Sequence, residues 1–491
     1  MRSDGVLPVE LPDAVREALL APLVDHNCHG VCRDDLTRAR FETLLTDAGT
    51  PAPPGTTHFD TPAGAAVRRW CAPVLGLAPH VPPAVYLARR MELGAAEVNR
   101  RLLDAAGIAT FLFDGSDDSY DLGDFGKSGD LGGRGGPAGP GGLGGAGGFG
   151  VLGGSRGPEG PGAVDRPDRL NRPDRFDAGP GGAGVSPRTE TGHAGGTGGT
   201  ETARVVHIER AEEEVAGTAV SGVSYISALV QNLAERAARA VALKSVTAHR
   251  SGHPLDPARP SRGAVIAAAT RRLACPGEGL TDQVLLRHLL WTAVDVAREY
   301  GRPLQFHTGL ARHGAHPGRD GRITSGRRGT YGGGGSGGSG PSGAHAGPGR
   351  STDPGPHGAG PAPVTGFIVA VQPVGVPVVL LRSHPFHRQA ASLAGALPHV
   401  YVDVGAALTR SATGSAAVMA ELLELVPFHK QLFGSGGHGV AETCHLGALH
   451  YRRGLAGALA ARLADGEWSA ADAARVAQMI GSGNARRIYR L

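Results

Sequence analysis

The sequence has few cysteines, no long apolar run and no strong charge imbalance, and each scarcity excludes a class of protein. Its 491 residues include five cysteines without a Cys-x-x-Cys pair, so an odd thiol remains in any pairing scheme and reduced thiols are expected. No apolar run approaches membrane-spanning length, and acidic residues stand where a signal peptide needs a basic start. We therefore expect a soluble cytoplasmic protein with no membrane partner.

The charge is mild for a chain of this length. A formal net charge of +4 is spread over scattered arginines and forms no basic stripe, so no nucleic-acid partner is expected. The oligomeric state is left open, and a homo-oligomer is compatible with the composition.

Glycine and proline are abundant, and they are concentrated in two segments. The 79 glycines and 36 prolines gather at about 116–200, as in "GDLGGRGGPAGPGGLGGAGGFG", and at about 313–363, as in "GTYGGGGSGGSGPSGAHAGPG". Such segments bury too little apolar surface to offset the entropy of ordering them. We predict two long disordered insertions in one domain that spans residues 1–491.

Outside the insertions, short β-branched runs alternate with helical patterns. Candidate strands lie at 22–29, 109–114, 203–209, 241–248, 303–308, 376–383, 399–405 and 431–436. Between them, stretches at 83–107, 281–301 and 415–427 place apolar residues three and four apart, as amphipathic helices do. Eight apolar strands separated by helices predict an α/β fold, a TIM-like (β/α)8 barrel; a doubly wound open sheet is the alternative.

Polar residues follow these runs, and catalytic groups of such a barrel lie at the carboxyl ends of its strands. The stretch "LVDHNCHGV" ends the first strand, where alternation would put Asp25, Asn27 and His29 on one face and His26 and Cys28 on the other. Later strand ends supply Lys244, His249, Arg250, His307, Arg382, His384, Ser435, Gly436 and His438.

The order and spacing of these motifs resemble the amidohydrolase-related family of metal-dependent hydrolases. The nearest branch is similar to the amidohydrolase domain fused to glutamine synthetase in some plants and fungi. The resemblance rests on "DHNCHGV", "HFDTPAGAAVRRWCAPVLGL", "LKSV", "LQFHTG", "HPFHRQAA", "PHVYVDVG", "LFGSGGHGVAE" and "GNARRIYRL", and it covers most of the chain outside the insertions.

The resemblance implies a divalent ion, zinc, iron or manganese, held at the strand ends. His29 and His307 match two family ligands, whereas Asn27 and Arg382 stand at the places of two others and Gly436 at that of an aspartate. An amide is a weak ligand for such an ion, and glycine can neither bind it nor deprotonate a water molecule bound to it. The metal site therefore has three altered positions.

The remaining strand-end residues are candidates for contact with a substrate. Lys244, Arg382 and His384 are the candidate catalytic groups, and Arg250 and His438 the candidate substrate-binding groups. Each also has a simpler interpretation, as an ion-paired or hydrogen-bonded structural residue.

Two functions from different classes follow. The first is a hydrolase that cleaves a C–N or C–O bond of a small molecule with metal-activated water. The second is a catalytically inactive barrel that binds an anionic small molecule or a protein partner, with Arg382 forking onto a carboxylate or phosphate. In the alternative to an anion pocket, Arg382 pairs with Asp25 or Asp403 and fills the site.

The insertions generate a first prediction. Deletion of residues 115–200 and 318–361 should leave the barrel folded, because long structureless loops add little closure entropy and no core. Thermal unfolding monitored by circular dichroism should stay cooperative in the double deletion. Loss of cooperativity would show that the segments contribute to the core.

Overall fold

The computed structural model describes residues 6–46, 49–114, 120–121, 200–250, 254–309, 360–403, 405 and 414–491, without the side chains of residues 120, 121, 249 and 250. Eight parallel strands follow one another around a single sheet. They are β1 (Leu23–Cys28), β3 (Ile108–Phe113), β5 (Glu201–His207), β6 (Ala242–Ser245), β7 (Leu304–His307), β8 (Val378–Leu381), β9 (Val400–Asp403) and β10 (Gln431–Leu432).

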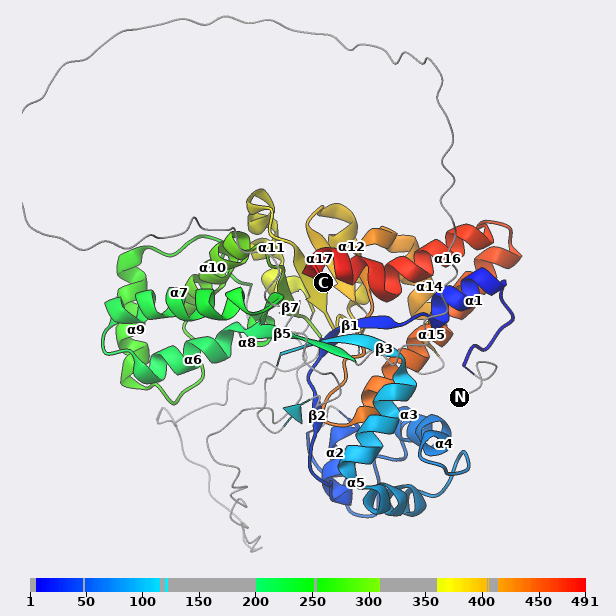
Figure 1. Ribbon diagram of the computed structural model, residues 1–491. Coiled ribbons are helices and arrows are strands. Elements are labelled where there is room, and N and C mark those ends of the chain that lie inside the picture. Colours follow the sequence, from blue (N-terminus) through cyan, green and yellow to red (C-terminus); the bar gives the residue numbers. More distant parts are fainter. Residues whose placement is uncertain are drawn as a thin grey trace, which may run out of the picture. The chain divides into compact units, whose positions relative to one another are not determined.

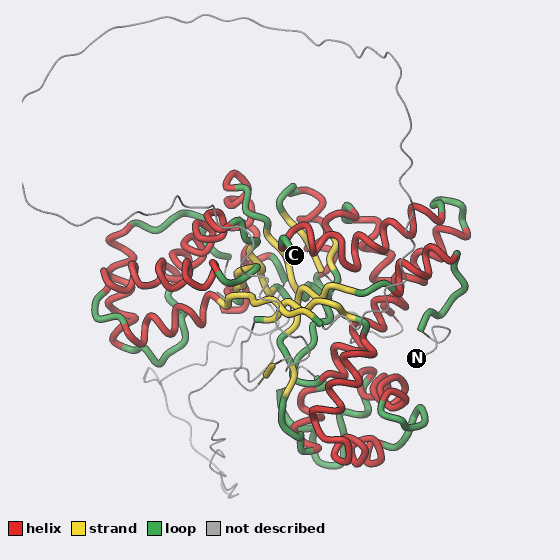
Figure 2. Tube along the Cα trace, in the orientation of Figure 1, coloured by secondary structure: helices red, strands yellow, loops and turns green. Residues whose placement is uncertain are grey.

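Backbone hydrogen bonds join the last strand region to the first. The His26 amide donates to the Phe433 carbonyl at 3.3 Å, and the Gly436 amide donates to the Asn27 carbonyl at 3.0 Å. The sheet therefore closes, and the predicted (β/α)8 barrel is confirmed over the open-sheet alternative. In Figure 2 the strands lie centrally among the described residues, with helices around them.

Three details differ from the sequence expectation. The strand predicted at 431–436 ends at Leu432, because the following residues bond to β1 outside a regular ladder. Two short strands, β2 (Val31–Cys32) and β4 (Tyr120–Asp121), pair antiparallel and were not predicted. The second insertion was drawn too wide, because Ala362–Val364 already forms a helical turn. The rest of both predicted insertions lies outside the described residues.

Helices follow most strands. They are α1 (Asp13–Leu20), α2 (Arg38–Leu44), α3 (Pro62–Ala66), α4 (Ala72–Val74), α5 (Pro83–Ala106), α6 (Ile208–Thr218), α7 (Gly222–Ala238), α8 (Thr247–Arg250), α9 (Arg262–Ala274), α10 (Gln283–Tyr300), α11 (Thr365–Val371), α12 (His387–Ala396), α14 (Ser415–Leu425), α15 (Ala441–Ala464), α16 (Ala470–Gln478) and α17 (Asn484–Tyr489). The three predicted helical stretches correspond to α5, α10 and α14.

Local sequence explains the ends of α10. The Asp282 carboxylate accepts hydrogen bonds from the backbone amides of Val284 and Leu285, which caps the first turn. Gly301 ends the helix with φ of 61°, a conformation that glycine adopts without strain. The buried face of α10 packs against α7 and α9, and these helices form a group with α6 (Figure 1).

Strand alternation divides the core into two layers. On β8, Val379 and Leu381 belong to the barrel interior, whereas Val378 and Leu380 pack toward the helices. Burial on both faces explains why this strand is apolar throughout. Helix α17 completes the interior with Ile488 and Tyr489. In the described part of the chain, no helix is both long enough and apolar enough to cross a bilayer.

A buried arginine on α15 fixes the helices that lead into β1 and β3. Arg452 donates to the carbonyls of Leu19 at 3.0 Å, Ala106 at 2.6 Å and Gly107 at 3.0 Å. These carbonyls belong to the last turn of α1 and the end of α5, where backbone acceptors lack helical partners. Burial lowers the pKa of Arg452 to about 10, so the guanidinium stays charged at neutral pH.

We predict that Arg452→Met lowers the free energy of unfolding by about 3 kcal/mol, because it leaves buried carbonyls without donors. Urea denaturation of both proteins measures the difference. The control is Arg100→Met, since Arg100 is half exposed and makes only surface ion pairs on α5; a change within about 0.5 kcal/mol is expected there. Equal effects of the two substitutions would contradict the role given to Arg452.

Candidate functional site

Polar and charged side chains from five strands meet at the carboxyl ends of the barrel. They are Asn27 and His29 from β1 and its end, Asp114 after β3, Lys244 from β6, Arg382 after β8 and Asp403 at the end of β9. All are buried except His29, whose side chain is 12% exposed. The structure thus brings together four residues selected from sequence, Asn27, His29, Lys244 and Arg382.

A lysine ammonium group lies in the middle of this cluster. Lys244 Nζ donates to Asp114 Oδ2 at 2.8 Å and to Asn27 Oδ1 at 3.3 Å. His29 Nδ1 lies 3.0 Å from the same Asp114 oxygen. Burial opposes ionisation of Asp114, but His29 and Lys244 hold its pKa well below the usual range. Asp114 and Lys244 therefore form a buried ion pair.

His29 is a neutral imidazole at physiological pH. Burial lowers its pKa to about 4, and the positive charges of Lys244 and Arg382 act in the same direction, against the attraction of Asp114. The ring lies with its centroid 5.4 Å from that of His438, so one predicted substrate-binding residue reaches the cluster.

Asp403 is the second buried carboxylate of the site. Its Oδ1 accepts a hydrogen bond from the Arg382 backbone amide at 3.1 Å, and its Oδ2 accepts one from Asn27 Nδ2 at 3.4 Å. His26 Nε2 lies 2.9 Å from Oδ2. Burial lowers the pKa of Arg382, and Asp403 and Asp114 oppose that shift, so both carboxylates act on this guanidinium.

The expected alternation of β1 is interrupted, and the prediction that His26 points away from the site is wrong. The β1–β3 ladder changes register between Asp25 and Cys28, so three steps on β1 match two on β3. His26 and Asn27 consequently approach the same oxygen of Asp403. Cys28 does point away, and its Sγ lies 3.9 Å from Cys444 Sγ in the outer core.

A tyrosine on α17 contacts this site from the barrel interior. The Tyr489 hydroxyl lies 2.9 Å from His26 Nδ1 and accepts a hydrogen bond from Gln305 Nε2 at 2.9 Å. Sequence reasoning missed His26, Asp114 and Tyr489 as site residues. The strand-end rule could have found Asp114, which directly follows the apolar run of β3; no local signal points to Tyr489.

The other predicted residues lie at the end of β7, in α8, and in the segments that follow β8 and β10. His307 ends β7 and is half-buried. His384 stacks on His387 with ring centroids 5.3 Å apart, and burial together with His387 lowers the pKa of His384. The Arg250 side chain lies outside the described residues. Gly436 has φ of 61°, where other residues are strained, and its amide bonds to β1.

These residues do not fit a divalent metal ion. Among the described residues, no three His, Cys, Asp or Glu side chains gather as metal ligands would. Asp114 is already paired with the Lys244 ammonium, and Arg382 has no free lone pair to offer a metal. A catalytic zinc site ordinarily has three protein ligands.

The ion pair generates a stability prediction. Lys244→Met should lower the free energy of unfolding by about 3–5 kcal/mol, because it leaves the Asp114 carboxylate buried without its cation. Adding Asp114→Asn removes that charge and should recover part of the loss. A double-mutant cycle from urea denaturation measures the coupling. Additive effects would mean that the two groups do not interact across 2.8 Å as the structure places them.

Comparison with known proteins agrees with the fold. A segment of 115 residues is 30% identical to protein fluG of Emericella nidulans; it makes up 23% of this chain and 13% of that protein. No protein-family model matches the chain.

Solved structures match over nearly the whole chain at low identity. A metal-dependent hydrolase from Lactobacillus casei superposes with a TM-score of 0.63 at 17% identity, covering 98% of both chains. Glucuronate isomerase from Caulobacter crescentus gives 0.53 at 14% identity, covering 100% of this chain and 97% of that one. A uronate isomerase from Bacillus halodurans gives 0.52 at 11%, covering 97% and 96%. The chain therefore has the (β/α)8-barrel fold that these proteins share.

Proposed function

We propose that this protein binds a small carboxylate-bearing molecule at the strand ends of its barrel, without a divalent ion. The position of Lys244 carries the proposal. Its ammonium contacts Asp114 and also Asn27, the residue that stands where the family resemblance places a metal-binding His. A divalent ion would have to displace Lys244 from these two oxygen atoms before it could bind them.

Arg382 supplies the second positive charge. Its guanidinium is buried at 5% residue exposure, and it stays protonated because arginine does not lose its proton in proteins. A planar fork of donors suits a carboxylate. Two solved structures with this fold are isomerases of uronates, which are sugar acids, and this supports the choice of ligand class.

The alternative is that Arg382 fills the site as an internal partner of Asp403. Asp403 and Asp114 balance the charges of Arg382 and Lys244, so a ligand carboxylate would have to compete with Asp403 for the guanidinium. Binding therefore has to be measured against removal of Arg382.

The competing function is hydrolysis of a C–N or C–O bond by metal-activated water. It requires a ligand set that the described residues do not form, so the donor chemistry favours the binding function. We also infer a reducing, cytoplasmic setting, supported by the odd number of cysteines and the lack of a Cys-x-x-Cys pair.

Calorimetric titration with glucuronate, succinate and inorganic phosphate tests the proposal. We expect saturable binding of a carboxylate, weakened about tenfold or more by Arg382→Ala, because a charge-assisted fork is lost. Arg382→Lys, which keeps the charge without the fork, should be intermediate. The control is Arg388→Ala, an exposed arginine paired with Glu421.

Two results would contradict the proposal. Binding that is absent, or unchanged by Arg382→Ala in a variant with normal thermal unfolding, would favour the filled site. Stoichiometric zinc, iron or manganese that survives dialysis would show that the protein binds the ion. That result would favour the hydrolase function over the binding function.

A further inference from the structure

A cavity of about 450 Å³ lies beside β5 and helices α6 and α7, and four arginines line it. Arg204 lies on β5, Arg210 on α6 and Arg236 on α7, and Arg239 is the residue that caps the carboxyl end of α7. Asp114 also lines this cavity, and because it pairs with Lys244 the cavity adjoins the strand-end site.

The arginine on β5 is unusual for its place in the fold. Its neighbours Ala203 and Val205 belong to the barrel interior, so Arg204 points to the outer face of the strand. Outer faces of barrel strands ordinarily pack apolar side chains against helices. Arg204 is instead exposed, and it lines the cavity.

The carboxylates of the cavity neutralise only part of its positive charge. Glu214 contacts Arg236 and lies 3.7 Å from Arg210, and Glu235 accepts a hydrogen bond from Gln231 at 2.9 Å. Asp114 is already balanced by Lys244. Four arginines against two glutamates leave two positive charges in excess.

The excess charge resides on identifiable side chains. Among the described residues, no carboxylate lies within ion-pair distance of Arg204 or Arg239, and both are exposed. Asn232 also lines the cavity, and its buried Oδ1 accepts no hydrogen bond from any described residue. The cavity thus offers guanidinium donors beside an amide oxygen that needs a donor.

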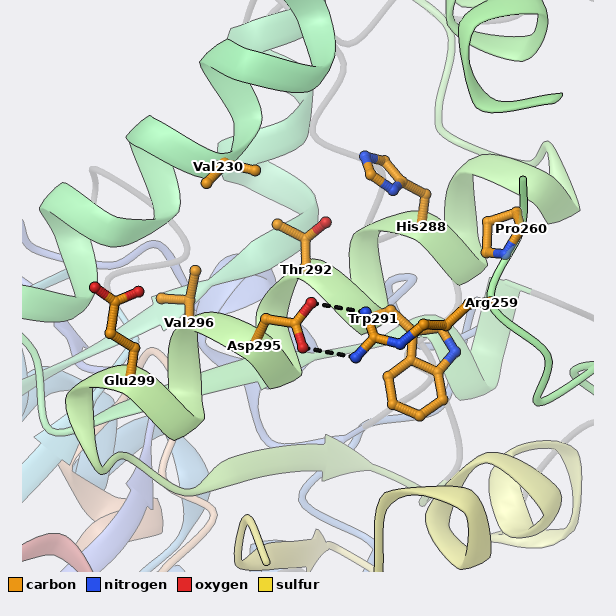
Figure 3. A pocket seen from close by; sticks show the side chains of 9 residues that line it. All are labelled: Val230, Arg259, Pro260, His288, Trp291, Thr292, Asp295, Val296 and Glu299. Carbon is orange, nitrogen blue, oxygen red and sulfur yellow. Dashed lines mark hydrogen bonds and ion pairs between the residues drawn. The ribbon is translucent and has the colours of Figure 1, made fainter. Parts of the chain in front are cut away.

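A hollow between α7 and α10 also contains an arginine, but there the arginine is paired with a carboxylate. There Arg259 makes a two-pronged ion pair with Asp295 and stacks on Trp291 (Figure 3). The Trp291 indole donates to the Pro257 carbonyl at 3.0 Å. The charge of that arginine is already neutralised, so the cavity beside β5 is the better anion site.

We propose that the cavity beside β5 binds a phosphate-bearing small molecule. Its phosphate would lie against Arg204 and Arg239, which present planar forks suited to phosphate oxygens. A hydroxyl or amide group next to the phosphate would donate to Asn232 Oδ1. This site adjoins the carboxylate site of the proposed function at Asp114, but it uses different arginines and does not depend on that proposal.

Titration of the full-length protein with inorganic pyrophosphate, followed by calorimetry and phosphorus NMR, tests the site. We expect saturable binding that the double substitution Arg204→Gln and Arg239→Gln weakens at least tenfold. Both residues are exposed, so the melting temperature should not change, and Arg239→Gln alone should give a smaller loss in the same direction. The matched control is Arg262→Gln, an exposed arginine at the start of α9 outside the cavity.

Arg382→Ala separates this site from the strand ends. Pyrophosphate binding should survive Arg382→Ala, and glucuronate binding, if the strand-end proposal holds, should survive the double substitution. The phosphate site is refuted by absent or unsaturable pyrophosphate binding, by an equal loss in Arg262→Gln, or by a loss confined to Arg382→Ala.

Discussion

A barrel holds its shape only if its last strand joins its first, and in this protein a buried carboxylate reinforces the backbone hydrogen bonds of that join. Asp25 Oδ1 accepts hydrogen bonds from the backbone amides of Asn27 on its own strand and of Ser435, 410 residues further along the chain. Burial raises the pKa of Asp25, and the bonds from Ser435 and Asn27 work against that rise. The strand-end site exists because this closure places Asn27 and His29 opposite the residues of the later strands.

Closure also creates the electrostatic condition that the site has to meet. Groups converging on the end of a closed barrel lose water, and an unpaired charge there costs several kcal/mol. Here Lys244 and Arg382 provide the positive charge, and Asp114 and Asp403 balance it.

Features of the fold and the site that depend on neighbouring residues in the sequence could be predicted, and features that depend on distant residues could not. The eight strands were predictable because strands buried on both faces, such as β8, are apolar at successive positions. Lys244 and Arg382 were predictable as strand-end residues. His26 was not, because the register change in β1 breaks the alternation on which its assignment relied. The arginine cavity was not, because its charges come from a strand, two helices and a helix end, and no single stretch of sequence displays them together.

The position of Tyr489 has a consequence for the order of events during synthesis. Tyr489 packs inside the barrel and contacts His26, and the two are 463 residues apart in the chain. At about 5–20 residues per second, roughly 20–90 s separate their emergence from the ribosome. During that interval β1 has been synthesised, but Tyr489, the α17 residue that contacts His26, has not. The first strand is therefore synthesised long before α17 can cover it. Until then the segment that contains β1 has to remain soluble.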